Sequence, residues 1–92
     1  MREWEIIYLA TALADARKLD AQDRLLIEQA VNTKLAHDPE TFGKPLRYTL
    51  RNYRVLRVGD WRVIFRIREH EILIGAIRHR RDGYQGIEAR FV

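Results

Sequence analysis

The segment from residue 78 to residue 84, RHRRDGY, gathers the residue types that phosphodiester chemistry requires. Cleavage of RNA by its own 2′-hydroxyl needs a group that removes the hydroxyl proton, cations that stabilise the charged transition state, and a donor for the departing 5′-oxygen. Arginine cannot be the base, because its pKa lies above about 12. His79 is the natural proton-transfer candidate, because its reference pKa of about 6.5 lies nearest neutrality. Tyr84 can transfer the proton instead if neighbouring arginines lower its pKa, or it can stack on a nucleobase.

A second group of cations lies on a predicted β-hairpin. Gly59-Asp60 is a two-residue connection with glycine first, which is typical of a type II′ turn. Counting outward from this turn places Arg57 opposite Arg62, with Arg66 farther along the same face. Like charges directly opposite each other destabilise a sheet, so this pair calls for an anion or a carboxylate. Arg54 falls on the apolar face in this register, which suggests a β-bulge.

The composition excludes several other chemistries. The chain has no serine, no cysteine and no glycine-rich phosphate loop, which excludes a serine nucleophile, a cysteine zinc site, and P-loop or dinucleotide binding. His37, His70 and His79 are too scattered to form a metal site. We therefore expect neither a metal nor a cofactor.

The size and hydropathy of the chain bound its architecture. A length of 92 residues, 47% apolar and 33% charged, predicts one small globular domain over residues 1–92. No apolar stretch approaches the roughly 18 residues of a membrane span, and the first residues do not resemble a signal peptide. The absence of cysteine fits a reducing compartment. We expect a cytoplasmic protein without membrane association.

The two halves of the chain carry opposite charge. Residues 1–42 contain five basic and eight acidic side chains, whereas residues 43–92 contain twelve basic and five acidic ones. Arginine accounts for 14 of the 17 cations, and its planar fork matches phosphate and carboxylate. The second half is therefore predicted to bind an anionic partner, the alternative being an arginine-rich surface that is only solvated.

The apolar periodicity predicts the order β-α-α-β-β-β, an α+β fold with a helical hairpin packed on one face of a twisted antiparallel sheet. The predicted helices run from an N-cap at Thr11 to residue 19, and from a cap at Asp20 to Asp38-Pro39. The predicted strands cover residues 3–9, 53–58, 61–68 and 72–78. Residues 79–92 are expected to form a last edge strand or a docked terminus.

Three stretches in this order resemble the RelE/ParE superfamily of toxins from bacterial type II toxin-antitoxin systems. They are GKPL at residues 43–46, LRVGDWRVIF at residues 56–65, and HRRDGY at residues 79–84. The resemblance covers nearly the whole chain and implies a RelE-like, ribonuclease-type fold that agrees with the predicted order. It also implies a function, because RelE-type members enter the ribosomal A site and cut mRNA there.

The resemblance assigns roles to several residues. Arg62 corresponds to the strand arginine that contacts the scissile phosphate. Arg81 or Arg80 corresponds to the family's C-terminal arginine, and Tyr84 to its C-terminal tyrosine. Arg54 and Arg57 stand where the best-known members have lysines, one of which is assigned a base role, so the base here must come from elsewhere and His79 is favoured. The candidate catalytic residues are Arg62, His79, Arg80, Arg81 and Tyr84, and the candidate RNA-binding residues are Lys44, Arg54, Arg57, Arg66 and Arg78.

Two other functions remain open. ParE-type members poison DNA gyrase and need no nuclease residues, and a non-catalytic relative would use its basic face only to bind an acidic antitoxin. For each of these three functions the expected partner is a cognate antitoxin, and a toxin-antitoxin heterotetramer is one expected assembly. A nuclease of this size is expected to rely on the ribosome to present mRNA, and to cut free RNA weakly or not at all.

Overall fold

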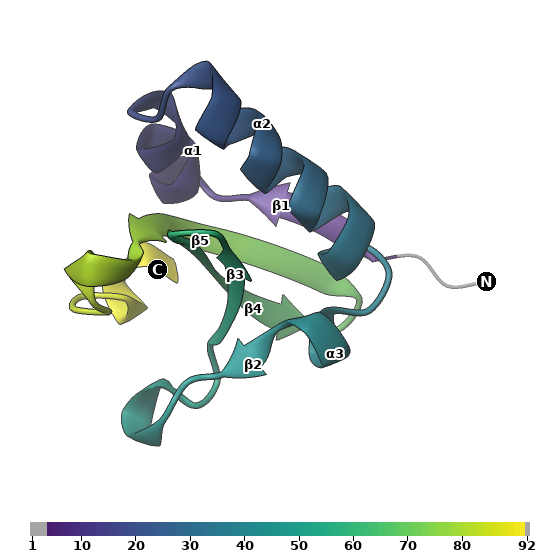
Figure 1. Ribbon diagram of the computed structural model, residues 1–92. Helices are drawn as coiled ribbons and strands as arrows, with labels where there is room; N and C mark the ends of the chain where they lie inside the picture. Colours follow the sequence, from purple (N-terminus) through teal and green to yellow (C-terminus); the bar gives the residue numbers. More distant parts are fainter. Residues whose placement is uncertain (1–3, 92) are drawn as a thin grey trace.

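The computed structural model describes residues 4–91 and contains a five-stranded sheet with two helices on one face (Figure 1). The strands are β1 (Glu5–Tyr8), β2 (Lys44–Pro45), β3 (Arg54–Val58), β4 (Trp61–Arg68) and β5 (Glu71–His79), in the spatial order β1-β5-β4-β3-β2. β1 pairs with β5 in parallel, and the other pairs are antiparallel. The predicted α+β fold is confirmed, but the first strand pairs in parallel where an antiparallel sheet was predicted, and the short β2 was not predicted.

The helices are α1 (Ala10–Arg17), α2 (Ala21–Ala30) and α3 (Pro39–Phe42). The predicted cap of α2 is confirmed, because the Asp20 side chain accepts a hydrogen bond from the backbone of Asp23 at 2.9 Å. The predicted cap at Thr11 is wrong. The Leu9 backbone N–H still donates to the carbonyl of Ile74, so α1 begins immediately after β1 and Thr11 lies inside its first turn.

The segment after α2 differs from the predicted continuous helix. A π-helical stretch, Val31–Leu35, follows α2. Pro39 then begins α3 rather than only ending a helix, since the first helical position needs no backbone N–H. The Asp38 side chain caps this short helix through the backbone and hydroxyl of Thr41, at 3.2 and 2.6 Å.

The two faces of the sheet carry two hydrophobic clusters. Trp61, Val63 and Phe65 of β4 point toward α1 and α2 and belong to the larger cluster. The other face carries the smaller cluster, whose buried members are Ile64, Ala76 and Ile87. We call this second side the open face, because α1 and α2 do not cover it.

The C-terminal segment crosses the open face. It forms two 3₁₀ turns, Arg80–Asp82 and Glu88–Phe91, and Tyr84 and Phe91 pack against the smaller cluster. The predicted docked terminus is therefore confirmed, and no edge strand forms within residues 79–91. No helix within residues 4–91 has the length and hydrophobicity to cross a membrane.

The bulge that the position of Arg54 predicted does not lie in the β3–β4 hairpin. Arg54 pairs regularly with Phe65, and the register shift occurs between β4 and β5, where Gly75 is the extra residue. Arg54 does lie on the helix side of the sheet, and its guanidinium donates to the carbonyl of Gly43 at 2.8 Å. The hydrogen bond to this carbonyl accommodates the Arg54 guanidinium on the apolar face, so no bulge is needed there.

Acidification is expected to remove the contribution of the Asp38 cap to the stability of the fold. The hydrogen bonds from Thr41 hold the pKa of Asp38 below its usual value, so its stabilising effect is present above the unfolded-state pKa of about 3.9 and is lost as the pH falls through the folded-state pKa. Melting temperatures of wild type and Asp38→Asn should differ near neutrality and converge in acid, because asparagine caps a helix without titrating. Glu40→Gln is the control, and a pH-independent difference would contradict the prediction.

Candidate nucleic-acid interface

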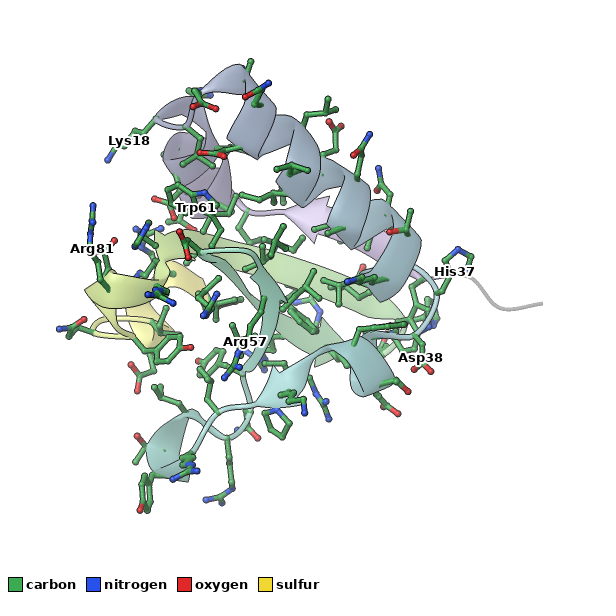
Figure 2. The ribbon with its side chains drawn as sticks, in the orientation of Figure 1. Lys18, His37, Asp38, Arg57, Trp61 and Arg81 are labelled. Atoms are coloured by element: carbon green, nitrogen blue, oxygen red, sulfur yellow. The ribbon has the colours of Figure 1, made fainter. Side chains whose placement is uncertain are left out.

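Three arginines lie side by side across the open face. Arg57 of β3 pairs with Arg62 of β4, which confirms the register counted from the turn, and Arg62 pairs with Arg78 of β5. Figure 2 shows Arg57 on the side of the sheet away from the helices and Trp61 on the helix side. Side chains directly opposite on neighbouring strands are about 4.5–5.5 Å apart at Cβ, so these charges repel one another. We call Arg57, Arg62 and Arg78 the arginine row.

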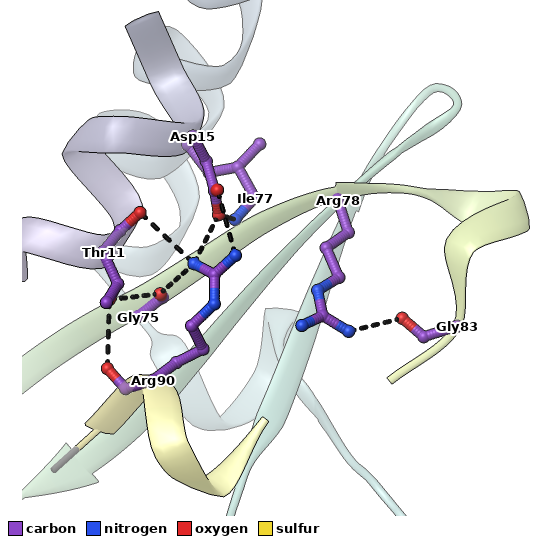
Figure 3. A network of polar contacts seen from close by, with 7 residues as sticks. All are labelled: Thr11, Asp15, Gly75, Ile77, Arg78, Gly83 and Arg90. Carbon is purple, nitrogen blue, oxygen red and sulfur yellow. Dashed lines mark hydrogen bonds and ion pairs between the residues drawn. The ribbon is translucent and has the colours of Figure 1, made fainter. Parts of the chain in front are cut away.

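No carboxylate among residues 4–91 forms an ion pair with the arginine row. Arg62 Nη1 donates to the carbonyls of Gly59 and Trp61 at 2.9 and 3.0 Å. Arg78 Nη1 donates to the carbonyl of Gly83 at 3.1 Å (Figure 3). These bonds orient two guanidinium groups without neutralising them, and Arg57 is exposed. The row therefore presents positive charge that an external anion can compensate.

A groove of about 480 Å³ adjoins the arginine row. Its lining consists of Arg57, Lys44 and Tyr84 together with Pro45, Leu46, Arg47, Leu50 and Val55. Lys44 pairs with Val55 and therefore lies on the open face, and the Tyr84 ring packs against the smaller hydrophobic cluster. The groove thus combines three cations, Lys44, Arg47 and Arg57, with a phenol, and both Tyr84 and Lys44 can exchange a proton.

An ion pair that the sequence analysis missed anchors the segment that carries Tyr84. Both terminal nitrogens of Arg90 donate to the Asp15 carboxylate, at 2.9 and 3.1 Å, and the backbone N–H of Ile77 donates to the same carboxylate at 2.9 Å (Figure 3). The Thr11 hydroxyl lies 2.7 Å from the carbonyl of Gly75 and 3.0 Å from that of Arg90. No local pattern could reveal a pair of residues that lie 75 positions apart.

His79 lies on the other side of the sheet from the arginine row. It pairs with Trp61, and the two rings make an edge contact with centroids 5.3 Å apart. Its Nδ1 accepts a hydrogen bond from the backbone of Arg81 at 3.3 Å, so the imidazole caps the following 3₁₀ turn. This placement separates His79 from Tyr84 and the groove, and weakens the prediction that it transfers the proton.

The remaining candidates, Arg54, Arg66, Arg80 and Arg81, lie outside the arginine row. Arg80 forms an exposed ion pair with Asp60 at 3.7 Å, and Arg81 points into solvent beside it (Figure 2). Arg66 shares the open face but lies beyond the bulge, where it pairs with Leu73. Arg54 points to the helix side. The structure therefore brings together Lys44, Arg57, Arg62, Arg78 and Tyr84 out of the predicted set.

Residues 4–91 contain no group of three or more histidine and acidic side chains that could hold a metal ion. The arginine row and the proton-exchanging side chains of the groove suit phosphate binding by cations, with proton transfer by a side chain of the groove.

Comparison with known proteins identifies the family. A family model described as the ParE toxin of the type II toxin-antitoxin system parDE matches residues 3–84. The chain belongs to this toxin family. The resemblance to the RelE/ParE superfamily is thereby confirmed. A search of curated protein sequences found no match.

Solved structures of related toxins share the fold. The toxin-antitoxin complex RelBE2 of Mycobacterium tuberculosis contains a chain with 26% identity and a TM-score of 0.80, covering 86% of this toxin and 100% of that chain. The archaeal RelE-RelB complex of Pyrococcus horikoshii gives 18% identity and a TM-score of 0.66, with 87% and 98% covered. A mutant of the E. coli toxin RelE in the free state gives 15% identity and a TM-score of 0.68, and the match covers 95% of this toxin and 90% of that chain.

Proposed function

We propose that this toxin is an endoribonuclease that cuts mRNA on the ribosome and so blocks translation. The observation that carries the proposal is the arginine row, which lies beside the groove lined by Tyr84 and has no carboxylate partner within residues 4–91. RNA phosphates supply the missing negative charge. The likeness to RelE structures supports this choice at the level of the fold.

The proposed roles follow from the geometry. Arg57 binds the scissile phosphate, because its exposed side chain makes no hydrogen bond with the described residues, and Arg62 and Arg78 stabilise the charge that builds up on it. The 2′-oxygen loses its proton and attacks phosphorus, and the bond to the 5′-oxygen breaks as that oxygen receives a proton. Tyr84 is the first candidate for proton transfer and Lys44 the second, because both line the groove.

A cognate antitoxin is the proposed partner in the resting state. The RelBE2 and Pyrococcus RelE-RelB structures are complexes of a toxin with its antitoxin. An acidic antitoxin segment would compensate the arginine row and keep RNA out of the groove, in a heterotetramer or another toxin-antitoxin assembly. The active toxin would act in the cytoplasm, where ribosomes translate mRNA.

Gyrase poisoning is the second candidate function. The family model that matches residues 3–84 is that of ParE, which favours this alternative. A gyrase poison would need the basic surface for protein contacts but would not depend on the Tyr84 hydroxyl. A direct assay on each target separates the two functions.

Primer extension on mRNA in a purified translation reaction tests the proposal. Wild-type toxin should produce cuts at codon positions, with weak or no cutting of the same RNA without ribosomes. Arg57→Ala should slow cutting by about 10²-fold, since it removes one donor to the transition state. Arg17→Ala is the matched control, because Arg17 is also exposed but lies on α1. Absence of cuts together with inhibition of purified gyrase would replace the proposal by the alternative.

A further inference from the structure

Tyr48 combines an unfavourable backbone with an exposed ring. Its φ of 58° lies in the left-handed region, which bulky residues rarely adopt. Burial of the side chain does not compensate for this unfavourable backbone. Tyr48 is 83% exposed, the largest value among the exposed large hydrophobic residues. Folding therefore gains little from a tyrosine at this position, and glycine or asparagine would suit the backbone better.

The backbone around Tyr48 is held in place. The Leu46 backbone N–H donates to the carbonyl of Tyr53 at 2.9 Å, which closes the loop at its base. The Arg51 backbone N–H donates to the carbonyl of Tyr48 at 3.1 Å, and Leu50 packs against the smaller hydrophobic cluster. The 3₁₀ turn Tyr48–Leu50 projects from the sheet next to β2 (Figure 1). The ring is thus presented on an ordered support.

The surroundings of the ring are basic. Residues 44–57 contain five cations and no acidic residue. Arg47 and Arg51 flank the turn, both are exposed, and neither forms an ion pair with a carboxylate of residues 4–91. Arg47 and Leu50 also line the groove that contains Arg57 and Tyr84. The turn that carries the ring therefore adjoins the proposed active site through Arg47 and Leu50, and exposed cations flank the ring in the sequence.

We infer that Tyr48 is a stacking platform for an unpaired RNA base next to the phosphate held in the groove. An exposed aromatic ring with flanking arginines is the arrangement by which proteins hold single-stranded RNA, since the ring stacks on a base and the cations bind the backbone. This inference rests on the proposed nuclease function and extends it to substrate positioning. The base can belong to the mRNA or to ribosomal RNA, because the stacking chemistry is the same.

Variants of Tyr48 test the inference in the ribosome-dependent cleavage reaction. Tyr48→Ala should raise the toxin concentration needed for half-maximal cutting by about ten-fold and leave the rate at saturation nearly unchanged, because the ring positions RNA and does not react. Tyr48→Phe keeps the stacking surface and should behave as wild type. Thr49→Ala is the control within the same turn.

Thermal unfolding separates this role from a structural one. Tyr48→Asn removes the ring but suits the left-handed backbone, so it should keep or raise the melting temperature while it weakens cleavage as Tyr48→Ala does. A fall in melting temperature that parallels the loss of cleavage would overturn the inference, since the ring would then serve the fold.

Photocrosslinking identifies the bound molecule. A toxin with photoreactive p-benzoyl-phenylalanine in place of Tyr48 should crosslink to RNA in ribosome complexes, and primer extension on the mRNA and on ribosomal RNA shows which strand supplies the base. The same group in place of Phe42, on α3, is the control. Crosslinks to protein alone would overturn the inference.

The outcomes separate the two proposals. If the wild-type toxin cuts mRNA and Tyr48→Ala cuts it equally well at every toxin concentration, the stacking role is wrong and the nuclease proposal stands. If the wild-type toxin produces no cuts, the nuclease proposal is wrong and the stacking role that depends on it is wrong as well.

Discussion

Tyr84→Phe is expected to slow ribosome-dependent mRNA cleavage by about 10²- to 10⁴-fold, the range typical of a lost proton-transfer group. The substitution removes only the hydroxyl from the groove that Tyr84 shares with Arg57 and Lys44. Arginine cannot take over the proton, and His79 lies on the other side of the sheet, against Trp61. Single-turnover primer extension at saturating toxin measures the rate, and the melting temperature should stay close to that of wild type.

Tyr53→Phe provides the matched control for this experiment. Tyr53 packs against the same hydrophobic cluster, with its ring 4.9 Å from that of Phe91, but it does not line the groove. This variant should cut at the wild-type rate. If Tyr84→Phe does so too, Tyr84 does not transfer the proton, and a slow Lys44→Met variant would then move that role to Lys44.

Arg90→Ala is expected to lower the free energy of unfolding by about 2–4 kcal/mol, and to slow cleavage as well. Breaking a buried ion pair costs roughly 3–5 kcal/mol because the remaining charge stays uncompensated, and partial exposure reduces this cost. The Arg90 and Asp15 side chains are 27% and 12% exposed. The pair joins α1, β5 and the C-terminal segment, so its loss should release Tyr84 from the groove.

Urea unfolding of Arg90→Ala, Asp15→Asn and the double variant measures this coupling. The double variant should be more stable than the sum of the two single losses predicts, since no charge is then left without its partner. Arg68→Ala is the control for an exposed ion pair, which contributes about 0–1 kcal/mol. An unchanged urea midpoint for Arg90→Ala would show that the pair does not hold the segment.

The roles of Arg90 and His79 show where prediction from the sequence reached its limit. His79 and Tyr84 are five residues apart, and their residue types made both of them candidates for proton transfer, with His79 favoured. The path of the chain after β5 separates them. His79 ends the strand on the helix side, and the turn with Gly83 at φ 72° brings Tyr84 to the open face. Arg90 had no local signal, because its partner comes from the first helix.

Local chemistry in the sequence determined the hairpin of this toxin. A glycine before an aspartate between two alternating strands is enough to set the turn, and the turn sets the register that places Arg57 opposite Arg62. The family resemblance came from the same local stretches. Tertiary structure alone decided the third member of the row, because Arg78 reaches Arg62 through the pairing of β4 with β5 and a bulge at Gly75. The bulge shifts the register of this hairpin by one residue, and no short segment of sequence predicts it, because side-chain packing on both faces of the sheet determines which register is stable.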